Sequence, residues 1–212
     1  MIKKIVFDFD GTLADTREVF LKALGHLSQK HGFKRLSPQE IQEMLKLPIR
    51  QRCKVMEIPL HKIPLLFHES LRLLKTMEMA SPYPGIQEVV RALQEREVDL
   101  VILSSNSSEY IEKFLQVHDL DSFQSIISTS GLFGKHRDLK KLLKRSRLSP
   151  QNLIYVGDEI RDIESSRRAL VSIVCVTWGF DSLYLLEKGS PDYLVHEPRE
   201  IVNLVDRLNY KA

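Results

Sequence analysis

The feature that most restricts the fold of this chain is an apolar N-terminal strand that runs directly into two carboxylates. Residues 1–7 read Met-Ile-Lys-Lys-Ile-Val-Phe, and Asp8, Phe9, Asp10, Gly11 and Thr12 follow. The Gly-Thr pair ends the strand, and loops at strand ends are where catalytic residues concentrate. Two acids this close repel each other unless a cation lies between them or one holds a proton, so the pair indicates a divalent metal. The alternative is an Asp-Gly hairpin turn with two solvated acids.

Three further segments place polar residues after apolar runs. Residues 98–103 lead into Ser104, Ser105 and Asn106; residues 153–156 lead into Gly157 and Asp158, with Asp162 four residues later; and Gly134 and Lys135 lie downstream of Ile126 and Ile127. With the N-terminal pair, this ordered set resembles the four motifs of the haloacid dehalogenase-like hydrolase superfamily. The resemblance spans nearly the whole chain, and four motifs in order are far more specific than any one of them.

The order of the apolar segments predicts an α/β fold. From residue 81 onward, helices are expected at 86–96, 108–118, 137–147 and 200–208, alternating with strands at 98–103, 126–127, 153–156, 173–176 and, at an edge, 193–195. Such alternation implies parallel strands joined by right-handed crossovers, so we expect a doubly wound parallel sheet, the Rossmann-like core of the superfamily. Asp8, Ser105 and Asp158 each follow a strand and are expected to meet at the carboxyl edge of the sheet.

An inserted α-helical cap is expected over residues 15–80, which lack a clear strand pattern and contain predicted helices at 18–31, 38–47 and 62–79. Residues 1–14 and 81–212 are assigned to the core. The cap segment carries twelve Lys and Arg against seven Asp and Glu. A basic lid over an acidic site favours an anionic substrate, although a solvated helical surface explains the same count.

The resemblance implies a chemical role for each motif carboxylate. Asp8 would be the nucleophile that accepts a phosphoryl group, and Asp10 the general acid and base. Dehalogenase-like members lack the second Asp, since a halide leaving group needs no proton, so Asp10 favours phosphate chemistry. Mg2+ would be bound by the side chains of Asp8 and Asp158 and the backbone carbonyl of Asp10, with Asp162 in an outer-sphere role that holds water or Lys135. Without the N-terminal motif, Asp158 would be interpreted as a helix N-cap.

The same resemblance assigns phosphate binding to Ser105, Asn106 and Lys135. Ser105 offers a hydroxyl and a backbone N–H at a helix start, and it is preferred over Ser104 because it directly precedes Asn106. Lys135 would balance the charge of the nucleophile and the phosphoryl oxygens, whereas outside the motif it would be an ordinary solvated lysine. His136 stands where similar phosphatases have Pro, so this loop is expected to differ in shape.

Substrate choice is expected to depend on the cap. Arg50 and Arg52 follow Pro48 in a loop expected between two cap helices, and Arg17 lies beside the first hinge. A bidentate arginine there would hold a substrate carboxylate or a second phosphate; a salt-bridged surface arginine is the alternative for each of them.

Composition and charge exclude several other classes. The chain has 212 residues, 43% of them apolar, and a formal net charge of +3, which is too small to indicate nucleic-acid or membrane binding. No apolar run reaches the roughly 18 residues of a membrane span, and no signal-peptide pattern is present. Cys53 and Cys175 indicate neither a disulfide framework nor a metal site. A cytoplasmic location with reduced thiols is therefore expected.

Together these features predict a Mg2+-dependent phosphatase similar to the phosphoglycolate phosphatase branch, acting on a small phosphorylated metabolite through an aspartyl-phosphate. A sugar-phosphate phosphomutase uses the same intermediate, and a requirement for a sugar bisphosphate would distinguish it. A non-catalytic binding protein that keeps the fold would show no turnover. The sequence carries no signal of oligomeric state.

Overall fold

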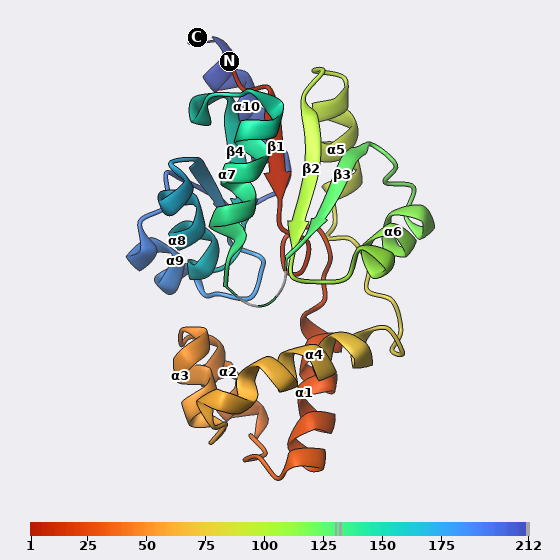
Figure 1. Ribbon diagram of the computed structural model, residues 1–212, viewed down its shortest axis with the longest axis vertical. Helices are drawn as coiled ribbons and strands as arrows, with labels where there is room; N and C mark the ends of the chain where they lie inside the picture. The colour runs from red at the N-terminus through yellow and green to blue at the C-terminus, as the bar shows by residue number, and fades with distance from the viewer. Residues whose placement is uncertain (130, 132, 211–212) are drawn as a thin grey trace.

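A parallel β-sheet forms the centre of the protein in a computed structural model, which describes residues 1–129, 131 and 133–210 (Figure 1). Among the described residues the sheet has six strands in the order β3-β2-β1-β4-β5-β6, and every neighbouring pair is parallel. The strands are β1 Lys4–Phe7, β2 Asp99–Ser104, β3 Phe123–Ser128, β4 Leu153–Gly157, β5 Ser172–Val176 and β6 Tyr193–Val195. The predicted doubly wound sheet is therefore confirmed, with 193–195 at its edge.

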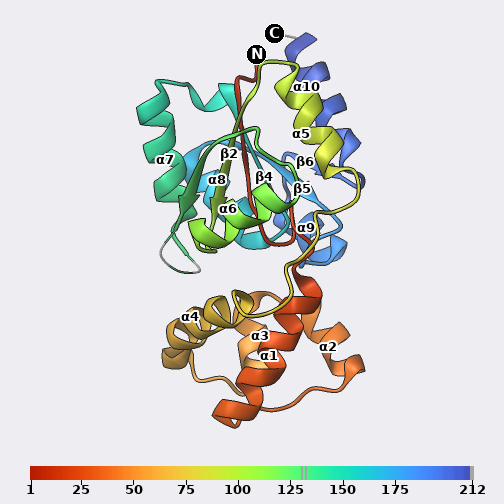
Figure 2. The same ribbon diagram turned by 90° about the vertical axis from the view of Figure 1, so that its right-hand side faces the viewer.

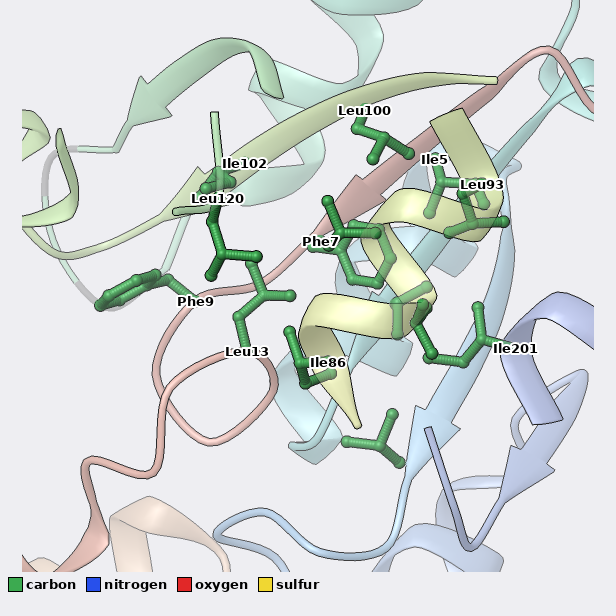
Figure 3. Packing of buried hydrophobic residues seen from close by; sticks show 14 of the residues in the cluster. Ile5, Phe7, Phe9, Leu13, Ile86, Leu93, Leu100, Ile102, Leu120 and Ile201 are labelled. Carbon is green, nitrogen blue, oxygen red and sulfur yellow. The ribbon is translucent and has the colours of Figure 1, made fainter. Parts of the chain in front are cut away.

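Alternation along the strands separates two apolar layers. Ile5 and Phe7 of β1 belong to one layer, whereas Val6 belongs to the other, because successive side chains of a strand point to opposite faces. The first layer is covered by α5 Ile86–Gln94, α6 Ser108–Val117 and α10 Arg199–Tyr210, and the second by α7 Lys135–Ser146, α8 Ile160–Ala169 and α9 Leu183–Gly189. Figure 3 shows Ile5 and Phe7 packed beside Leu93 and Ile201 in the first layer. Helices on both faces allow the parallel sheet to be apolar on both sides.

A group of helices between β1 and α5 lies beyond the carboxyl ends of the strands (Figures 1 and 2). In this fully described segment the helices are α1 Arg17–His31, α2 Pro38–Leu45, α3 Ile49–Val55, the 3-10 turn η1 Leu60–Lys62 and α4 Ile63–Leu74. Leu27, Phe33 and Leu66 form a small apolar centre among them. At the start of α2, Ser37 and Glu40 form a capping box, in which each side chain accepts a hydrogen bond from the backbone N–H of the other.

Two segments connect this helical group to the sheet, and they lie side by side. The N–H of Asp15 donates to the carbonyl of Ser81 at 2.8 Å, and the N–H of Tyr83 donates to the carbonyl of Leu13 at 3.0 Å. The boundaries predicted for the cap, 15–80, fall at this paired stem, and the division of the chain into a core and a cap domain stays a prediction. Residues 130, 132, 211 and 212, which the predicted core includes, lie outside the described residues.

Helix boundaries differ from the prediction at several places. Residues 49–55 form α3, so the predicted loop around Arg50 and Arg52 is wrong: Pro48 is the N-cap of a helix, a position where it interrupts no helical hydrogen bond. Helix α4 ends at Leu74, short of the predicted residue 79, because the chain then extends to reach the stem. Helix α7 begins at Lys135 instead of 137, and α9 is absent from the predicted elements. Among the described residues, no helix has both the length and the apolar character needed to cross a bilayer.

Candidate active site

The two acids of the N-terminal motif lie where β1 ends. Asp8 is buried; its Oδ1 accepts from the N–H of Phe9 at 2.7 Å, and its Oδ2 accepts from the ammonium group of Lys135. Asp10 is half-buried, and Nδ2 of Asn106 lies 3.3 Å from each of its carboxylate oxygens as a hydrogen-bond donor. Asn106 follows β2, which pairs directly with β1. The strand order therefore brings these distant parts of the sequence together, as predicted.

Lys135 is a buried cation surrounded by three oxygen acceptors. Its Nζ donates to Asp8, to Oη of Tyr155 at 2.8 Å and to Oδ1 of Asp162 at 2.9 Å. The hydroxyl of Tyr155 donates in turn to Oδ1 of Asp162 at 2.8 Å. Only 4% of Lys135 is exposed, so the alternative of an ordinary solvated lysine is wrong.

Asp158 is fully buried at the end of β4. Its Oδ1 accepts from Oγ1 of Thr12 at 2.7 Å, and its Oδ2 accepts from the N–H of Phe180 at 2.7 Å. Gly11 has a φ of +78°, and a Cβ there would lie 2.3 Å from Oδ2 of Asp158, so both conformation and space require glycine. The N-cap of α8 is Glu159 and not Asp158, which excludes the simple N-cap interpretation of Asp158.

Asp162 links the first turn of α8 to the lysine. Its Oδ2 accepts from the backbone N–H groups of Asp158 at 3.2 Å and Glu159 at 3.1 Å, while its Oδ1 accepts from Lys135 and Tyr155. These contacts occupy both carboxylate oxygens. They put Asp162 beside Lys135, where the sequence expected it, and its outer-sphere role stays a prediction.

Three carboxyl groups of the site carry raised pKa values. Burial raises the pKa of Asp8 to about 7, although Lys135 opposes the shift. Burial also raises the pKa of Asp10 to about 6, against the hydrogen bonds that its carboxylate accepts. Burial and repulsion from Glu159 and Asp8 raise the pKa of Asp158 well above its ordinary range. A cation close to these carboxyl groups would favour their charged forms.

Asp162 behaves in the opposite way. Burial disfavours its charge, but Lys135 and Arg161 together hold its pKa below the ordinary value. The pKa of Lys135 is raised, because Asp162 and Asp8 outweigh the effect of burial. The lysine is therefore charged and is shared between Asp162 and Asp8, and its attraction does not outweigh the effect of burial on the pKa of Asp8.

Carboxylate oxygens of Asp8, Glu159 and Asp162 lie within 4.8 Å of one another, close enough to bind one metal ion. This cluster differs from the predicted ligand set, which joins Asp8 to Asp158 and the carbonyl of Asp10. Asp8 belongs to both sets. Hard oxygen donors and uncompensated negative charge both suit Mg2+, so the residues present fit this ion.

Replacing Lys135 by Met should lower the free energy of unfolding by about 3–5 kcal/mol, because Asp162 would then be a buried charge without its main partner. Chemical denaturation of both proteins measures the difference. Adding Asp162→Asn to the Lys135→Met variant should recover part of the loss, since the amide carries no charge.

The matched control for this experiment is Lys141→Met on the same helix, which removes an exposed ion pair with Asp138 at 3.0 Å. Exposed pairs contribute little, so this variant should unfold almost as the parent does. Equal losses in Lys135→Met and Lys141→Met would contradict the buried-pair argument.

The two candidate serines of the second motif are distinguished by their contacts. Ser104 is fully buried and its Oγ accepts from the N–H of Asn106 at 3.0 Å, so its hydroxyl serves the local turn. Both serines line the cavity that also contains Asp8 and Lys135, but Ser105 is half-exposed and no hydrogen bond of its hydroxyl competes with a ligand among the described contacts. The contacts favour Ser105 over Ser104 as the residue open to a ligand; its phosphate-binding role stays a prediction.

The three cap arginines do not gather at the site. Only Arg52 lines the cavity, and its guanidinium is buried in an ion pair with Asp181. The Arg50 guanidinium lies 5.7 Å from the centre of the Phe133 ring, and Arg17 begins α1 away from the cavity lining. For Arg52 the buried ion pair favours the structural alternative, and a specificity role for Arg17 or Arg50 stays a prediction.

Three residues that take part in the site received no role from the sequence. Thr12 follows the motif acids directly, so a place for it beside Asp158 could have been predicted from the same motif. Tyr155 places a hydroxyl group within an otherwise apolar strand, and this pattern predicts a buried hydrogen-bond partner for that hydroxyl. Asp181 offers no such signal, because its partners, Arg52 of α3 and the N–H of Ile160, are distant in sequence and only tertiary packing brings them to it.

Known proteins share both the sequence pattern and the fold. The family model of the haloacid dehalogenase-like hydrolases matches residues 5–176, which include all of the motif residues. The chain belongs to this family. A phosphoglycolate phosphatase from Synechococcus elongatus is 30% identical to it over 209 residues, covering 98% of this chain and 99% of the relative.

Other members of the family match over similar lengths. A pyrophosphatase from Oceanobacillus iheyensis is 23% identical over 209 residues, covering 96% of this chain and 97% of the relative. The structure of a haloacid dehalogenase-like hydrolase from Streptococcus pneumoniae superposes with a TM-score of 0.81 at 21% identity, covering 96% of this chain and 98% of the other. These matches confirm the predicted family and its phosphatase branch.

Proposed function

We propose that this haloacid dehalogenase-like hydrolase is a Mg2+-dependent phosphomonoester hydrolase, which cleaves a small phosphorylated metabolite through an aspartyl-phosphate on Asp8. The observation that carries the proposal is the arrangement at the floor of the cavity. There a carboxylate, a buried ammonium group and a second carboxyl group with a pKa of about 6 lie together. These are the nucleophile, the charge stabiliser and the acid that phosphoryl transfer requires.

Asp8 is positioned to attack. The N–H of Phe9 and the ammonium of Lys135 hold its two oxygens, which restricts the rotation of the carboxylate. One of these oxygens forms the new bond to phosphorus as the bond to the alcohol oxygen of the substrate breaks. Lys135 and the hydroxyl of Ser105 then bind phosphoryl oxygens, whose negative charge grows in the transition state.

Asp10 serves as the general acid and then as the general base. Its carboxyl group gives a proton to the departing alcohol, and the resulting carboxylate later takes one from the water that attacks the aspartyl-phosphate. A pKa of about 6 lets the group hold either state near neutral pH. The Nδ2 group of Asn106, 3.3 Å from both oxygens, orients the carboxyl group and favours its charged form for the second step.

Mg2+ would be held by Asp8 and Asp158 together with the backbone carbonyl of Asp10, and when bound it would neutralise negative charge on the phosphoryl oxygens. Thr12 and the N–H of Phe180 fix the Asp158 carboxylate from the side of the core. Glu159 is the competing ligand, because its carboxylate belongs to the close cluster with Asp8 and Asp162.

Release of inorganic phosphate should require Mg2+ and stop when EDTA is added. The assay uses 2-phosphoglycolate, pyrophosphate and simple alkyl phosphates, with Asp8→Asn as the blank. Asp158→Asn should raise the half-saturating Mg2+ concentration at least about tenfold, since a ligand is lost. Glu159→Gln should resemble Glu164→Gln, which changes an exposed acid on the same helix.

Metal binding can also be measured without turnover, from the melting temperature. Mg2+ should raise the melting temperature of the parent and of Glu159→Gln but not that of Asp158→Asn. The reverse order of the two variants would transfer the ligand role to Glu159. Full activity in EDTA would contradict metal dependence altogether.

Acceptor choice separates this proposal from a sugar-phosphate phosphomutase. A mutase returns the phosphoryl group to a sugar and needs a sugar bisphosphate, whereas the proposed enzyme transfers it to water. Release of phosphate from a monoester in the absence of any bisphosphate supports hydrolysis. A protein that uses the fold only for binding would release none.

A further inference from the structure

A cavity of about 160 Å³ joins the helical cap to the carboxyl edge of the sheet. Asp8, Asp10 and Lys135 line its polar end. The walls that the cap contributes are almost entirely apolar and include Phe20 and Leu24 of α1, Met44 of α2 and Phe67 and Leu71 of α4. The cavity thus has charged groups at the sheet end, while most of the side chains at the cap end are apolar.

The charged side chain that the cap brings to this cavity is already engaged. Arg52 donates from Nε to the carbonyl of Leu47 at 2.6 Å and from Nη2 to the carbonyl of Leu45 at 3.0 Å, and it pairs with Asp181. It is 7% exposed. Arg52 therefore connects α3 to the loop after β5. Because its Nε and Nη2 groups already donate to protein oxygens, they are not available as a pair to bind a substrate carboxylate.

The other described basic residues of the cap are not among those that line the cavity. Several form ion pairs at the surface: Lys22 with Glu18, Lys30 with Glu69, Lys34 with Glu40 and Lys46 with Glu43. Among the described residues that line the cavity, Arg52 is the one Lys or Arg contributed by residues 15–80. The basic balance of the cap is therefore a property of its solvated surface, and the prediction of a basic lid receives no support.

We propose that the substrate is a phosphate monoester of an apolar alcohol, whose organic group fills the cap end of the cavity. This inference rests on the proposed phosphatase function. A cavity of roughly 150 Å³ lined by apolar side chains accommodates benzene, so a space of about 160 Å³ suits an organic group no larger than one six-membered ring. A carboxylate or several hydroxyl groups on the alcohol would lose water there without gaining partners.

The experiment measures kcat/KM for the linear series ethyl, propyl, butyl, pentyl and hexyl phosphate in the presence of Mg2+. Each added methylene should raise kcat/KM about fourfold, the transfer free energy of one buried methylene, until the cavity is full. A parallel series with a terminal hydroxyl group, together with 2-phosphoglycolate, should be hydrolysed at least about tenfold less efficiently than the alkyl ester of equal length.

Variants of α4 test whether the cap wall is responsible. Leu71→Asn, which makes the wall polar, should reduce the gain per methylene, while Leu65→Asn, the same change at an exposed position of α4 outside the lining, should retain it. Leu71→Phe should move the best chain length downward, because a larger side chain shortens the cavity. Because Leu71→Phe keeps the wall apolar, a change in the preferred chain length would not be explained by a destabilised cap.

Failure of this proposal is distinguishable from failure of the proposed function. If no ester of either series releases phosphate in an Asp8-dependent reaction, the phosphatase function itself is wrong. If the esters are hydrolysed but chain length has no effect, or if the hydroxylated series or 2-phosphoglycolate is preferred, only the apolar substrate class is overturned. An equal loss of the methylene gain in Leu71→Asn and Leu65→Asn would also overturn it.

Discussion

Replacing Asp8 by Asn is expected to remove phosphate release, with kcat falling by a factor on the order of 10⁴ or more, because the amide cannot form the phosphoryl bond. The fold should persist. Lys135 keeps Asp162 at 2.9 Å and Tyr155 at 2.8 Å, and the amide has nearly the shape of the carboxylate. Continuous phosphate detection with saturating Mg2+ and substrate measures the loss.

Covalent catalysis also predicts a phosphorylated enzyme intermediate, which can be tested with the parent protein and Asp8→Asn. After a rapid acid quench, a phosphoryl group should be found on the parent enzyme at Asp8 and be absent from Asp8→Asn. Asp121→Asn, at an exposed position, is the control for a general effect of losing one carboxylate. Turnover by Asp8→Asn at the rate of Asp121→Asn would show that Asp8 is not the nucleophile.

Replacing Asp10 by Asn should lower kcat for an alkyl phosphate by roughly 10²–10⁴-fold, because the alcohol then departs without a proton. The loss should depend on the leaving group. With 4-nitrophenyl phosphate the first step needs no proton, so Asp10→Asn should release a burst of nitrophenolate equal to the enzyme concentration. Slow turnover should follow, because the variant also lacks the base for the attacking water.

Stopped-flow absorbance at the nitrophenolate band resolves the burst from the slow phase. The phosphorylated enzyme should accumulate during the slow phase and be detectable by mass spectrometry. Equal losses for alkyl and nitrophenyl esters, with no burst, would contradict the acid–base role of Asp10 and leave it as a structural neighbour of Asn106.

Strand ends account for most of the success of the sequence-based prediction of the site. Asp8, Asn106 and Asp158 each follow a buried strand, and a parallel sheet brings such positions to one edge whatever their separation in the chain. The family motifs then supplied the expected roles. Local pattern and topology were sufficient here, because neither depends on the details of side-chain packing.

The boundaries of short helices were less predictable. Residues 49–55 of α3 carry no clear apolar period, and residues 183–189 of α9 are too few to establish one. Both helices form where the chain has a cap residue, Pro48 and Ser182, and a core to pack against. Tertiary contacts decide the state of such short segments, because isolated helices of this length are unstable in water.

The amino-acid sequence by itself determined the alternation of strands and helices, the family and the carboxylates that gather at the sheet edge, since these follow from local periodicity and from covalent order. Only the tertiary structure decided that Lys135 pairs with Asp162 and donates to Tyr155, that Arg52 pairs with Asp181, and that the cap wall of the cavity is mostly apolar. These outcomes depend on which side chains meet across separate elements, and long-range packing rather than local pattern selects those partners.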